Sequence, residues 1–255
     1  MMTQSERHQY ITRQLEKKGF VRVLELAEQL GVSGATIRKD LRIMESQHLL
    51  YRNHGSASLI TPKVVDLPVR EKSKINSELK LKIAKAADAL IAQDDSIILT
   101  SGSTIEALAL NMSSHGNLNV VTPSIRVGVY LSEKDNVSIL MLGGRLIPNS
   151  LSVRDEYSTE GLKHVNCNKM FCSCDGFDIE VGVTTATVEE ARITASMMDA
   201  ASEVILLVDS TKIGKSTYGK ICDVNRIDTI ITDSGIQQSV VDRLEDAGIQ
   251  VVIVG

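Results

Sequence analysis

The sequence has no long apolar run and no secretion signal, and each absence excludes a class of protein. No segment of the 255 residues approaches the roughly 20 consecutive apolar residues that a membrane-spanning helix requires. Residues 1–9 are mostly polar, which is not the pattern of a signal peptide. We therefore expect a cytoplasmic protein that has no part in a membrane.

The sequence also lacks the cysteine spacing of a zinc site. Structural zinc sites typically use two pairs of cysteines, each pair separated by about two to four residues. The chain has four cysteines, and Cys172 and Cys174 have only one residue between them. This pattern predicts buried free thiols, and we expect neither a metal nor an organic cofactor.

What the sequence does contain is ordinary in amount but uneven in distribution. It is 43% hydrophobic and 24% charged, as expected of a folded protein with a sizeable core. Residues 1–58 hold nine Lys/Arg and six Asp/Glu, a net charge of +3, so the rest carries −7 within an overall −4. A basic small part on an acidic larger part is expected when only the small part faces phosphates.

Residues 1–58 have the periodicity of a helix-turn-helix. Ser5 is expected to cap a first helix that stops at Gly19, and Gly31 to form the turn between a second helix and a third. Ser33 is the residue type that caps the third helix. The apolar residues that helical spacing turns inward are Ile11, Leu15, Val23, Leu26, Ala27, Leu30, Ile37, Leu41 and Met44.

The opposite face of the third helix carries small and basic residues, which is typical of a helix that enters the DNA major groove. Small residues let the backbone approach the DNA, and Lys and Arg reach guanine edges or phosphates. Two short strands around a glycine-containing turn, over residues 49–59, predict a wing. The expected DNA-binding residues are Ser33, Ala35, Thr36, Arg38, Lys39, Arg42, Arg52 and His54.

From residue 96 onward, short apolar runs alternate with helical patterns, which predicts a mainly parallel sheet covered on both faces. The expected strands are 96–100, 118–122, 137–142, 169–174, 204–209, 229–232 and 251–254. The expected helices are 78–92, 104–113, 124–132, 187–202 and 236–247. The chain is thus predicted to be α/β, with a small winged helix-turn-helix domain (1–58), a linker (59–76) and a larger, mainly parallel α/β effector domain (77–255).

Several loops at the carboxyl ends of these strands carry ligand-binding chemistry, and ligands of parallel sheets bind at such ends. Residues 100–104 combine a glycine, hydroxyl side chains and a helix N-terminus, which suit a phosphate but also make an ordinary capped turn. The loops at 175–178 and 209–215 add carboxylates and a lysine, which suit a sugar phosphate but also occur in solvated turns. The expected effector-binding residues are Ser101, Gly102, Ser103, Thr104, Gly144, Arg145, Asp175, Asp178, Thr184, Glu189 and Lys212.

Residues 6–58 resemble the winged helix-turn-helix of the DeoR family of bacterial transcription regulators. The resemblance rests on Leu26-Ala27, Gly31-Val32-Ser33, Thr36-Ile37-Arg38-Lys39-Asp40-Leu41, Glu45 and Arg52-x-His54-Gly55. The sequence departs from the family pattern at Gly34 and Ser56, and neither change removes a basic group.

Residues 77–255 are similar to the effector domain of the same family. The matching motifs are Ser101-Gly102-Ser103-Thr104, Val121-Thr122-x-Ser124, Gly143-Gly144, Asp175-Gly176-x-Asp178, Gly182-x-Thr184, Asp209-Ser210-x-Lys212-x-Gly214 and Thr232-Asp233. The resemblance implies a fold similar to ribose-5-phosphate isomerase and a phosphorylated sugar as allosteric effector. Thr100 stands where family members usually carry Asp. The stretch Glu189-Glu190-Ala191-Arg192 is most similar to regulators of amino-sugar or sugar-alcohol utilisation.

The residues and the resemblance leave two functions open. The favoured one is a repressor of carbohydrate-utilisation genes that binds a double-stranded DNA operator. We expect a homo-oligomer, a dimer or a tetramer, because two helix-turn-helix domains together read two half-sites of an operator. The alternative is a sugar-phosphate isomerase-like enzyme fused to a DNA-binding head, because Asp175–Asp178 resembles the paired-Asp loop of the isomerase. The isomerase has Lys-Gly-Gly after this loop, whereas residues 180–184 contain no lysine. We therefore expect binding without turnover and no catalytic residue.

Overall fold

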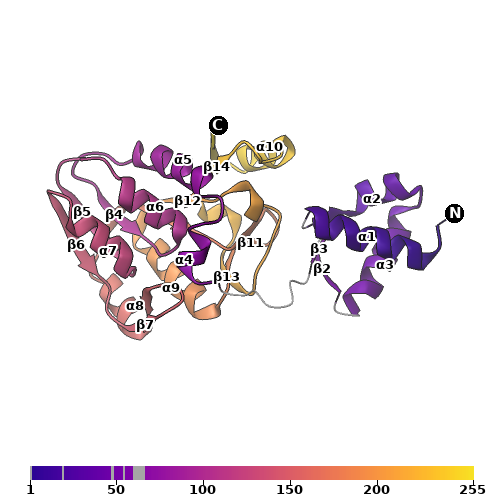
Figure 1. Ribbon diagram of the computed structural model, residues 1–255, viewed down its shortest axis with the longest axis horizontal. Coiled ribbons are helices and arrows are strands. Elements are labelled where there is room, and N and C mark those ends of the chain that lie inside the picture. Colours follow the sequence, from indigo (N-terminus) through magenta and orange to yellow (C-terminus); the bar gives the residue numbers. More distant parts are fainter. Residues whose placement is uncertain (1, 19, 47–48, 54, 60–66) are drawn as a thin grey trace. The chain divides into compact units, whose positions relative to one another are not determined.

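The computed structural model describes the chain apart from residues 1, 19, 47–48, 54 and 60–66 (Figure 1). The chain divides into two compact units. The first holds residues 1–64, called the head, together with residues 214–216, and the second holds residues 65–213 and 217–255, called the body. Among the described residues, no helix is both long and apolar enough to span a bilayer.

The head consists of helices packed on a small antiparallel sheet. Its elements are α1 (Gln4–Lys18), β1 (Phe20–Arg22), α2 (Val23–Leu30), α3 (Gly34–Ser46), β2 (Leu50–Asn53) and β3 (Ser56–Leu59). The strands pair in the order β1-β3-β2, so the predicted hairpin β2–β3 is confirmed and gains a third strand. The three residues of β1 are too few to show an alternating pattern, which is why the sequence did not reveal this strand.

The caps of the head helices agree with the sequence at α2 and α3 and differ at α1. Gly31 adopts the left-handed conformation with φ of 61°, and Ser33 Oγ accepts a hydrogen bond from Thr36 N at 3.1 Å. The prediction for Ser5 is wrong, because Ser5 lies inside α1 and Thr3 caps it. Thr3 Oγ1 accepts from Glu6 N at 3.3 Å while Thr3 N donates to the Glu6 carboxylate at 2.7 Å, a capping box.

The core of the head is made by the periodic apolar residues. Of the nine predicted positions, Ala27 and Leu30 are partly buried and pack against the core. The other seven are at most 4% exposed, and they are Ile11, Leu15, Val23, Leu26, Ile37, Leu41 and Met44. Burial of α3 through one face leaves its opposite face to solvent.

The body is built on a parallel sheet of seven strands among the described residues, which confirms the α/β class. The strands are ordered β15-β14-β12-β9-β4-β5-β6 and every pair is parallel. They are β4 (Ser96–Leu99), β5 (Leu118–Thr122), β6 (Val137–Met141), β9 (Cys167–Ser173), β12 (Ala201–Leu207), β14 (Thr229–Asp233) and β15 (Gln250–Val254). The bounds lie within three residues of those expected.

Helices cover both faces of this sheet, as the alternating pattern predicted. The helices that contact its strands are α5 (Ser77–Asp88), α6 (Ser103–Asn111), α7 (Ile125–Ser132), α9 (Val188–Asp199) and α10 (Gln238–Asp246). The body also contains α4 (Val69–Lys72), α8 (Glu156–Leu162) and short 3₁₀ turns at Ser210–Lys212 and Val224–Arg226. Successive residues of β4 serve opposite faces, because Ile97 and Leu99 pack with α5 and α6 while Ile98 packs with α9. Both faces of the sheet are therefore buried.

The body also has short antiparallel strands that the sequence did not reveal. They are β7 (Arg145–Ile147) and β8 (Ser152–Arg154), which pair as a hairpin, and β10 (Gly176–Asp178), β11 (Gly182–Thr185) and β13 (Gly219–Cys222), which form a second sheet. Each has three or four residues, so its pattern cannot be told from that of a loop.

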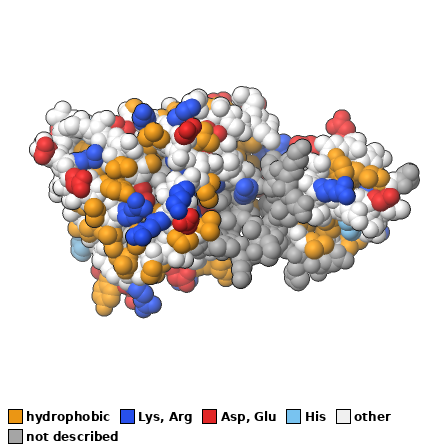
Figure 2. Space-filling view, in the orientation of Figure 1, with side chains coloured by type: hydrophobic (Ala, Val, Ile, Leu, Met, Phe, Trp, Pro, Cys, Tyr) orange, Lys and Arg blue, Asp and Glu red, His pale blue; other side chains and the backbone are white. Residues whose placement is uncertain are grey.

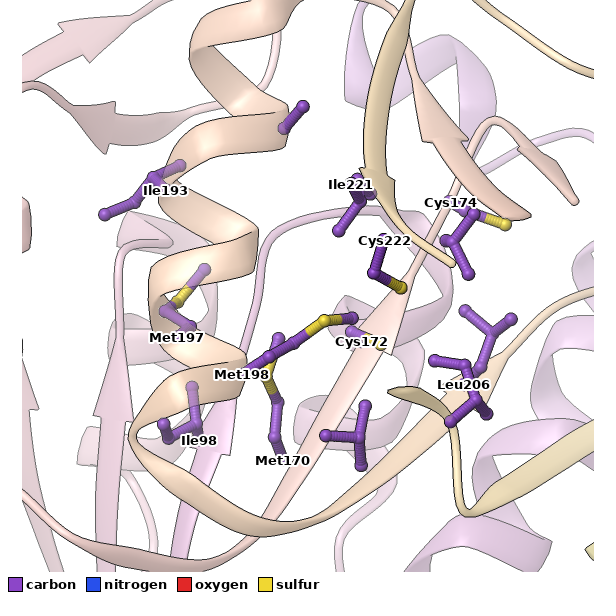
Figure 3. Close-up of a cluster of buried hydrophobic side chains, with 14 of the residues drawn as sticks. Ile98, Met170, Cys172, Cys174, Ile193, Met197, Met198, Leu206, Ile221 and Cys222 are labelled. Atoms are coloured by element: carbon purple, nitrogen blue, oxygen red, sulfur yellow. The ribbon is translucent and has the colours of Figure 1, made fainter. Parts of the chain in front are cut away.

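The four cysteines are free and buried, as predicted. Cys172, Cys174 and Cys222 belong to the core between the main sheet and α9, where Cys172 lies beside Met198 (Figure 3). Burial raises the pKa of Cys174 to about 12 and that of Cys222 to about 11. Thiols held in the protonated form by an apolar core are poor nucleophiles and poor metal ligands.

The strand order creates a switch point between β4 and β9. After β4 the chain adds β5 and β6 on one side, then returns to place β9 on the other side of β4. The loops that leave β4 and β9 therefore diverge at the carboxyl edge of the sheet. In sheets of this kind such a point is where ligands bind.

Candidate functional site

The exposed face of α3 is basic. Arg38, Lys39 and Arg42 are exposed, and Ala35 lies exposed in the first turn. Ser33 is exposed at the helix start, and its hydroxyl is hydrogen bonded to the Thr36 hydroxyl at 2.9 Å. The first turn of α3 thus presents small side chains and the next two turns present positive charge, an arrangement that fits a DNA groove.

A buried ion pair holds α3 against α1. Asp40 is 1% exposed, and its two carboxylate oxygens accept from Arg7 Nε at 2.7 Å and Arg7 Nη2 at 3.1 Å. His8 Nε2 lies 3.4 Å from the same carboxylate. This bidentate contact fixes the position of the basic face relative to the rest of the head. Asp40 stands in the middle of the α3 motif but points inward, so its role is structural.

The predicted wing is described only in part. Arg52 lies in β2, where it pairs with Ala57 of β3, and His54 lies outside the described residues. Both stay predictions as DNA contacts.

At the carboxyl end of β4, the loop at 101–104 leads directly into α6. Gly102 is the N-cap residue and has a φ of +118°, and a Cβ there would collide with Ser173 Oγ from the neighbouring strand. Because the N-cap is a glycine, it supplies no side chain to the N–H groups of the first helical turn. Ser103 and Thr104 are buried in that turn. The geometry is compatible with an anion at the helix N-terminus.

Asp175 lies at the carboxyl end of β9 and is surrounded by donors. Its carboxylate accepts from Lys72 Nζ at 2.9 Å, from Thr185 Oγ1 at 3.2 Å and from Ala186 N at 3.2 Å. Burial by itself would raise the pKa of Asp175, but the charges of Lys72 and Lys212 outweigh it and lower the pKa. Asp175 is therefore a carboxylate held charged by two ammonium groups.

Lys80 and Lys212 add two further positive charges to the same edge. Lys80 is 4% exposed, and its Nζ donates to the carbonyl oxygens of Lys72 and Ile75, the latter at 2.6 Å. Burial, and then the charge of Lys212, lower the pKa of Lys80 to about 8, although Asp209 opposes this. Lys212 Nζ donates to the Cys174 carbonyl at 2.6 Å. We call Lys72, Lys80, Lys212, Asp175 and Asp209 the lysine cluster.

A second charged group adjoins the lysine cluster. Arg154 of β8 is 7% exposed and donates to Thr187 Oγ1 and Ser150 Oγ, both at 2.8 Å, and its Nη1 lies 3.4 Å from Glu190. Burial raises the pKa of Glu190, with Arg154 opposing and Asp175 adding to the rise. The electrostatic coupling of Glu190 to Asp175 connects this group to the lysine cluster.

Several predicted effector-binding residues have contacts or exposure that define their structural setting, and their part in effector binding stays a prediction. Glu189 is exposed on α9, and the structure places its neighbour Glu190 in the charged group instead. Asp178 accepts from Glu180 N and Val181 N, so its carboxylate forms the turn between β10 and β11. The Thr184 hydroxyl donates to Gly176 O and accepts from Thr217 N within the second sheet.

Two predicted effector-binding residues, Gly144 and Arg145, lie in the loop after β6, and their part in effector binding also stays a prediction. Arg145 is exposed, and its backbone N–H, rather than its side chain, donates to Asp155 at 2.9 Å. Gly144 has a φ of +135°, and a Cβ there would meet Asp155 and Ser158. Across the hairpin, Arg145 pairs with Arg154, and it is Arg154 that is buried among charged groups.

Sequence reasoning missed Lys72, Lys80 and Arg154 as members of this site, whereas Asp209 stands in the loop 209–215 that the sequence singled out. Of the three, only Lys80 left a readable signal. It shares a helical stripe with Ile83, Ala84 and Ala87, all at most 1% exposed, and a lysine on an apolar stripe needs an explanation.

Comparisons with known proteins agree with this division into a head and a body. A family model described as the DeoR-like helix-turn-helix domain matches residues 7–63, and one described as the DeoR C terminal sensor domain matches residues 75–234. A putative aga operon transcriptional repressor of Escherichia coli O157:H7 is 36% identical, over 98% of this chain and 94% of its own. The glycerol-3-phosphate regulon repressor of Escherichia coli K12 is 27% identical over 98% of both chains.

Among solved structures, the chain is similar to a D-ribose-5-phosphate isomerase in complex with phospho-erythronic acid, with 19% identity, 54% of each chain covered and a TM-score of 0.40. A probable sor operon regulator from Shigella flexneri matches with 14% identity over 63% of this chain and 86% of its own, at a TM-score of 0.42.

Proposed function

The chain belongs to the DeoR family, and from this premise we propose that it is a DNA-binding repressor of carbohydrate-utilisation genes whose effector is a phosphorylated sugar. The head binds a double-stranded operator through the exposed face of α3. The body binds the effector at the carboxyl edge of its sheet. The protein acts in the cytoplasm, where its operator is.

The observation that carries the effector proposal is the lysine cluster. Burial lowers the pKa of Lys80 most, and the charges of Lys212 and Lys72 lower it further although Asp209 opposes them, so the three ammonium groups stand close enough together to repel one another. The strand that leads to Asp175 contacts the loop before α6, since the Ser173 hydroxyl donates to the Ser101 carbonyl at 3.2 Å. The N-cap of α6 is a glycine, and the helix dipole adds positive potential there. A phosphate group neutralises the lysines, while Asp175 suits the hydroxyl groups of a sugar.

The names of the relatives support the same class of ligand. One is a putative repressor of the aga operon and another a repressor of the glycerol-3-phosphate regulon. The second name contains a phosphorylated polyol, glycerol 3-phosphate. A phosphorylated sugar or sugar alcohol fits that name and the charges of the lysine cluster.

We also propose that the body mediates self-association. Hydrophobic side chains gather on one face of the body (Figure 2), and five of them lie on α7, β6 and β7 with exposed fractions between 37% and 53%. These are Ile125, Val129, Leu140, Met141 and Leu146. The edge strand β6 also carries no charged residue that would prevent pairing with a second copy. Sedimentation as a monomer at micromolar concentration would contradict this part.

One observation favours the isomerase alternative. Residues 180–184 contain no lysine after the loop Asp175–Asp178, yet Lys72 of α4 places its Nζ 2.9 Å from Asp175. An ammonium, a carboxylate and Glu190 with its raised pKa are groups that proton transfer uses. We infer binding without turnover, and incubation of the protein with ribose 5-phosphate tests it. Formation of ribulose 5-phosphate would establish the alternative.

The function is tested in two steps. Selection from a random duplex library identifies a DNA site, and the affinity for that site is measured by fluorescence anisotropy. A panel of sugar phosphates is then screened by thermal shift, because a ligand that binds only the native state raises the melting temperature. We expect one member of the panel to stabilise the body and weaken DNA binding. Unphosphorylated versions of the same sugars are the matched control and should do neither.

A further inference from the structure

The short helix α4 connects the effector site to the segment that joins the head to the body. It spans Val69–Lys72, within the predicted linker 59–76, and begins three residues after residue 66, after which the described part of the chain resumes. Val69 is 3% exposed, and its N–H donates to the Asn149 carbonyl at 2.7 Å. The helix also contacts α6, the helix that starts at the candidate phosphate loop (Figure 1). The helix α4 is thus part of the body.

Lys72, the last residue of α4, contacts other members of the lysine cluster through both its side chain and its backbone. Its Nζ makes the ion pair with Asp175 at 2.9 Å, and both side chains are mostly buried. Its carbonyl oxygen accepts from the ammonium of Lys80, which also binds the Ile75 carbonyl just beyond the helix. A ligand that recruits either lysine therefore changes a contact that positions the end of α4.

An anion entering the lysine cluster competes with these contacts. A phosphate offers charged acceptor oxygens to Lys72, Lys80 and Lys212, whereas Lys72 now has Asp175 and Lys80 has neutral carbonyls. An ammonium donates up to three hydrogen bonds, so one lysine can hold a phosphate oxygen and a carboxylate oxygen together. Lys212 approaches the same site from the loop after β12, on the far side of β9 from β4.

We propose that Lys72 is an effector-binding residue that bridges the ligand phosphate and Asp175, and that this bridge is how effector occupancy reaches the linker. The inference rests on the proposed function, because it assumes a phosphorylated effector in the lysine cluster. Its further content is that the contact is made by the residue at the end of α4 rather than by the sheet loops alone. Ligand binding then changes the order of residues 67–76, to which the head is tethered.

The test uses the full chain, inorganic phosphate as the probe, and three variants. Lys72→Gln removes the charge, Lys72→Arg keeps it, and Lys74→Gln is the control. Lys74 lies two residues away, is paired with Glu71 and has a side chain that is 71% exposed. Phosphate affinity is measured by the concentration dependence of the melting temperature. Melting without phosphate shows whether each variant is folded.

We expect Lys72→Gln to bind phosphate at least roughly tenfold more weakly than wild type, the usual effect of losing a charge-assisted hydrogen bond. Lys72→Arg should recover most of that loss, and Lys74→Gln should differ from wild type by less than about twofold. Equal phosphate affinity of Lys72→Gln and wild type would overturn the inference while leaving the proposed function standing. If neither phosphate nor any sugar phosphate stabilises the wild type, the proposed function itself is wrong.

Hydrogen exchange separates binding from coupling. Phosphate should slow amide exchange in residues 67–76 of the wild type and of Lys74→Gln, and leave it unchanged in Lys72→Gln. Amides of α10 serve as the internal reference. Protection of residues 101–106 by phosphate without any change in residues 67–76 would show that the ligand binds and that α4 does not respond, which overturns the coupling.

Discussion

Replacement of Lys80 by methionine tests the electrostatics of the lysine cluster. Lys80 is 4% exposed, and its pKa is lowered from 10.5 to about 8. The difference corresponds to about 3 kcal/mol of free energy by which the folded state disfavours the charged form. Between pH 8 and 10.5 the unfolded state binds a proton that the folded state has lost, so the free energy of unfolding rises with pH in this window.

Methionine matches the length of the lysine side chain and does not titrate. Lys80→Met removes the buried charge, which stabilises the folded state. It also leaves the carbonyls of Lys72 and Ile75 without this donor, which lowers the free energy of unfolding by about 1–3 kcal/mol in all. The two effects nearly cancel at neutral pH, so we expect the variant to be about as stable as wild type there. Above pH 8 the wild type should gain up to about 3 kcal/mol relative to the variant.

The assay is denaturant unfolding of both proteins at several pH values from 7 to 10.5, monitored by circular dichroism. Taking the difference between the two proteins cancels the titration of all other groups. Parallel profiles would refute the lowered pKa of Lys80. In addition, phosphate affinity should fall above pH 8 in the wild type as Lys80 loses its proton, because a phosphate monoester is already fully ionised there. In Lys80→Met it should be weak at every pH.

Three further predictions concern the head and the effector loop. Arg38→Ala and Lys39→Ala should each weaken DNA binding by about 1–3 kcal/mol if a base is contacted, or reduce the slope of log affinity against log salt concentration by about one unit if a phosphate is contacted. Anisotropy titrations at several salt concentrations distinguish the two cases, and unchanged binding excludes α3 as the helix that reads the DNA. Asp40→Ala should destabilise the head by about 3 kcal/mol, because it leaves Arg7 without its partner at a mostly buried site; calorimetry should show the head melting earlier and the body unchanged. Lys212→Ala should keep DNA affinity and lose the effector response; a variant that responds at the wild-type effector concentration places Lys212 outside the site.

Much of the architecture could be predicted from local patterns. The apolar stripe of α3 follows from helical periodicity, and the same periodicity leaves Arg38 and Lys39 on the exposed face. The parallel sheet follows from continuous apolar strands alternating with helices, and the switch-point rule then points to the loops after β4 and β9. These features depend on residues close together in the chain, so the sequence suffices for them.

The residues of the candidate effector site could be predicted only in part from local sequence patterns. The choice between Glu189 and Glu190 depends on the rotation of α9 against the sheet, since adjacent helical residues point about 100° apart. Packing sets that rotation, and no local pattern encodes it. Similarly, the roles of Asp178 and Thr184 within the second sheet depend on the pairing of β10, β11 and β13, which are too short to recognise.

The sequence by itself determined the two-part organisation, the basic face of α3 and the glycine-hydroxyl loop before α6, because each is written in neighbouring residues. Only the tertiary structure decided that Lys72 meets Asp175, 103 residues away in the chain, and that Lys80 lies buried beside the charge of Lys212. Such pairings arise when the sheet brings distant loops to one edge. The free energy of a charge there depends on burial and on neighbours that the chain order does not reveal.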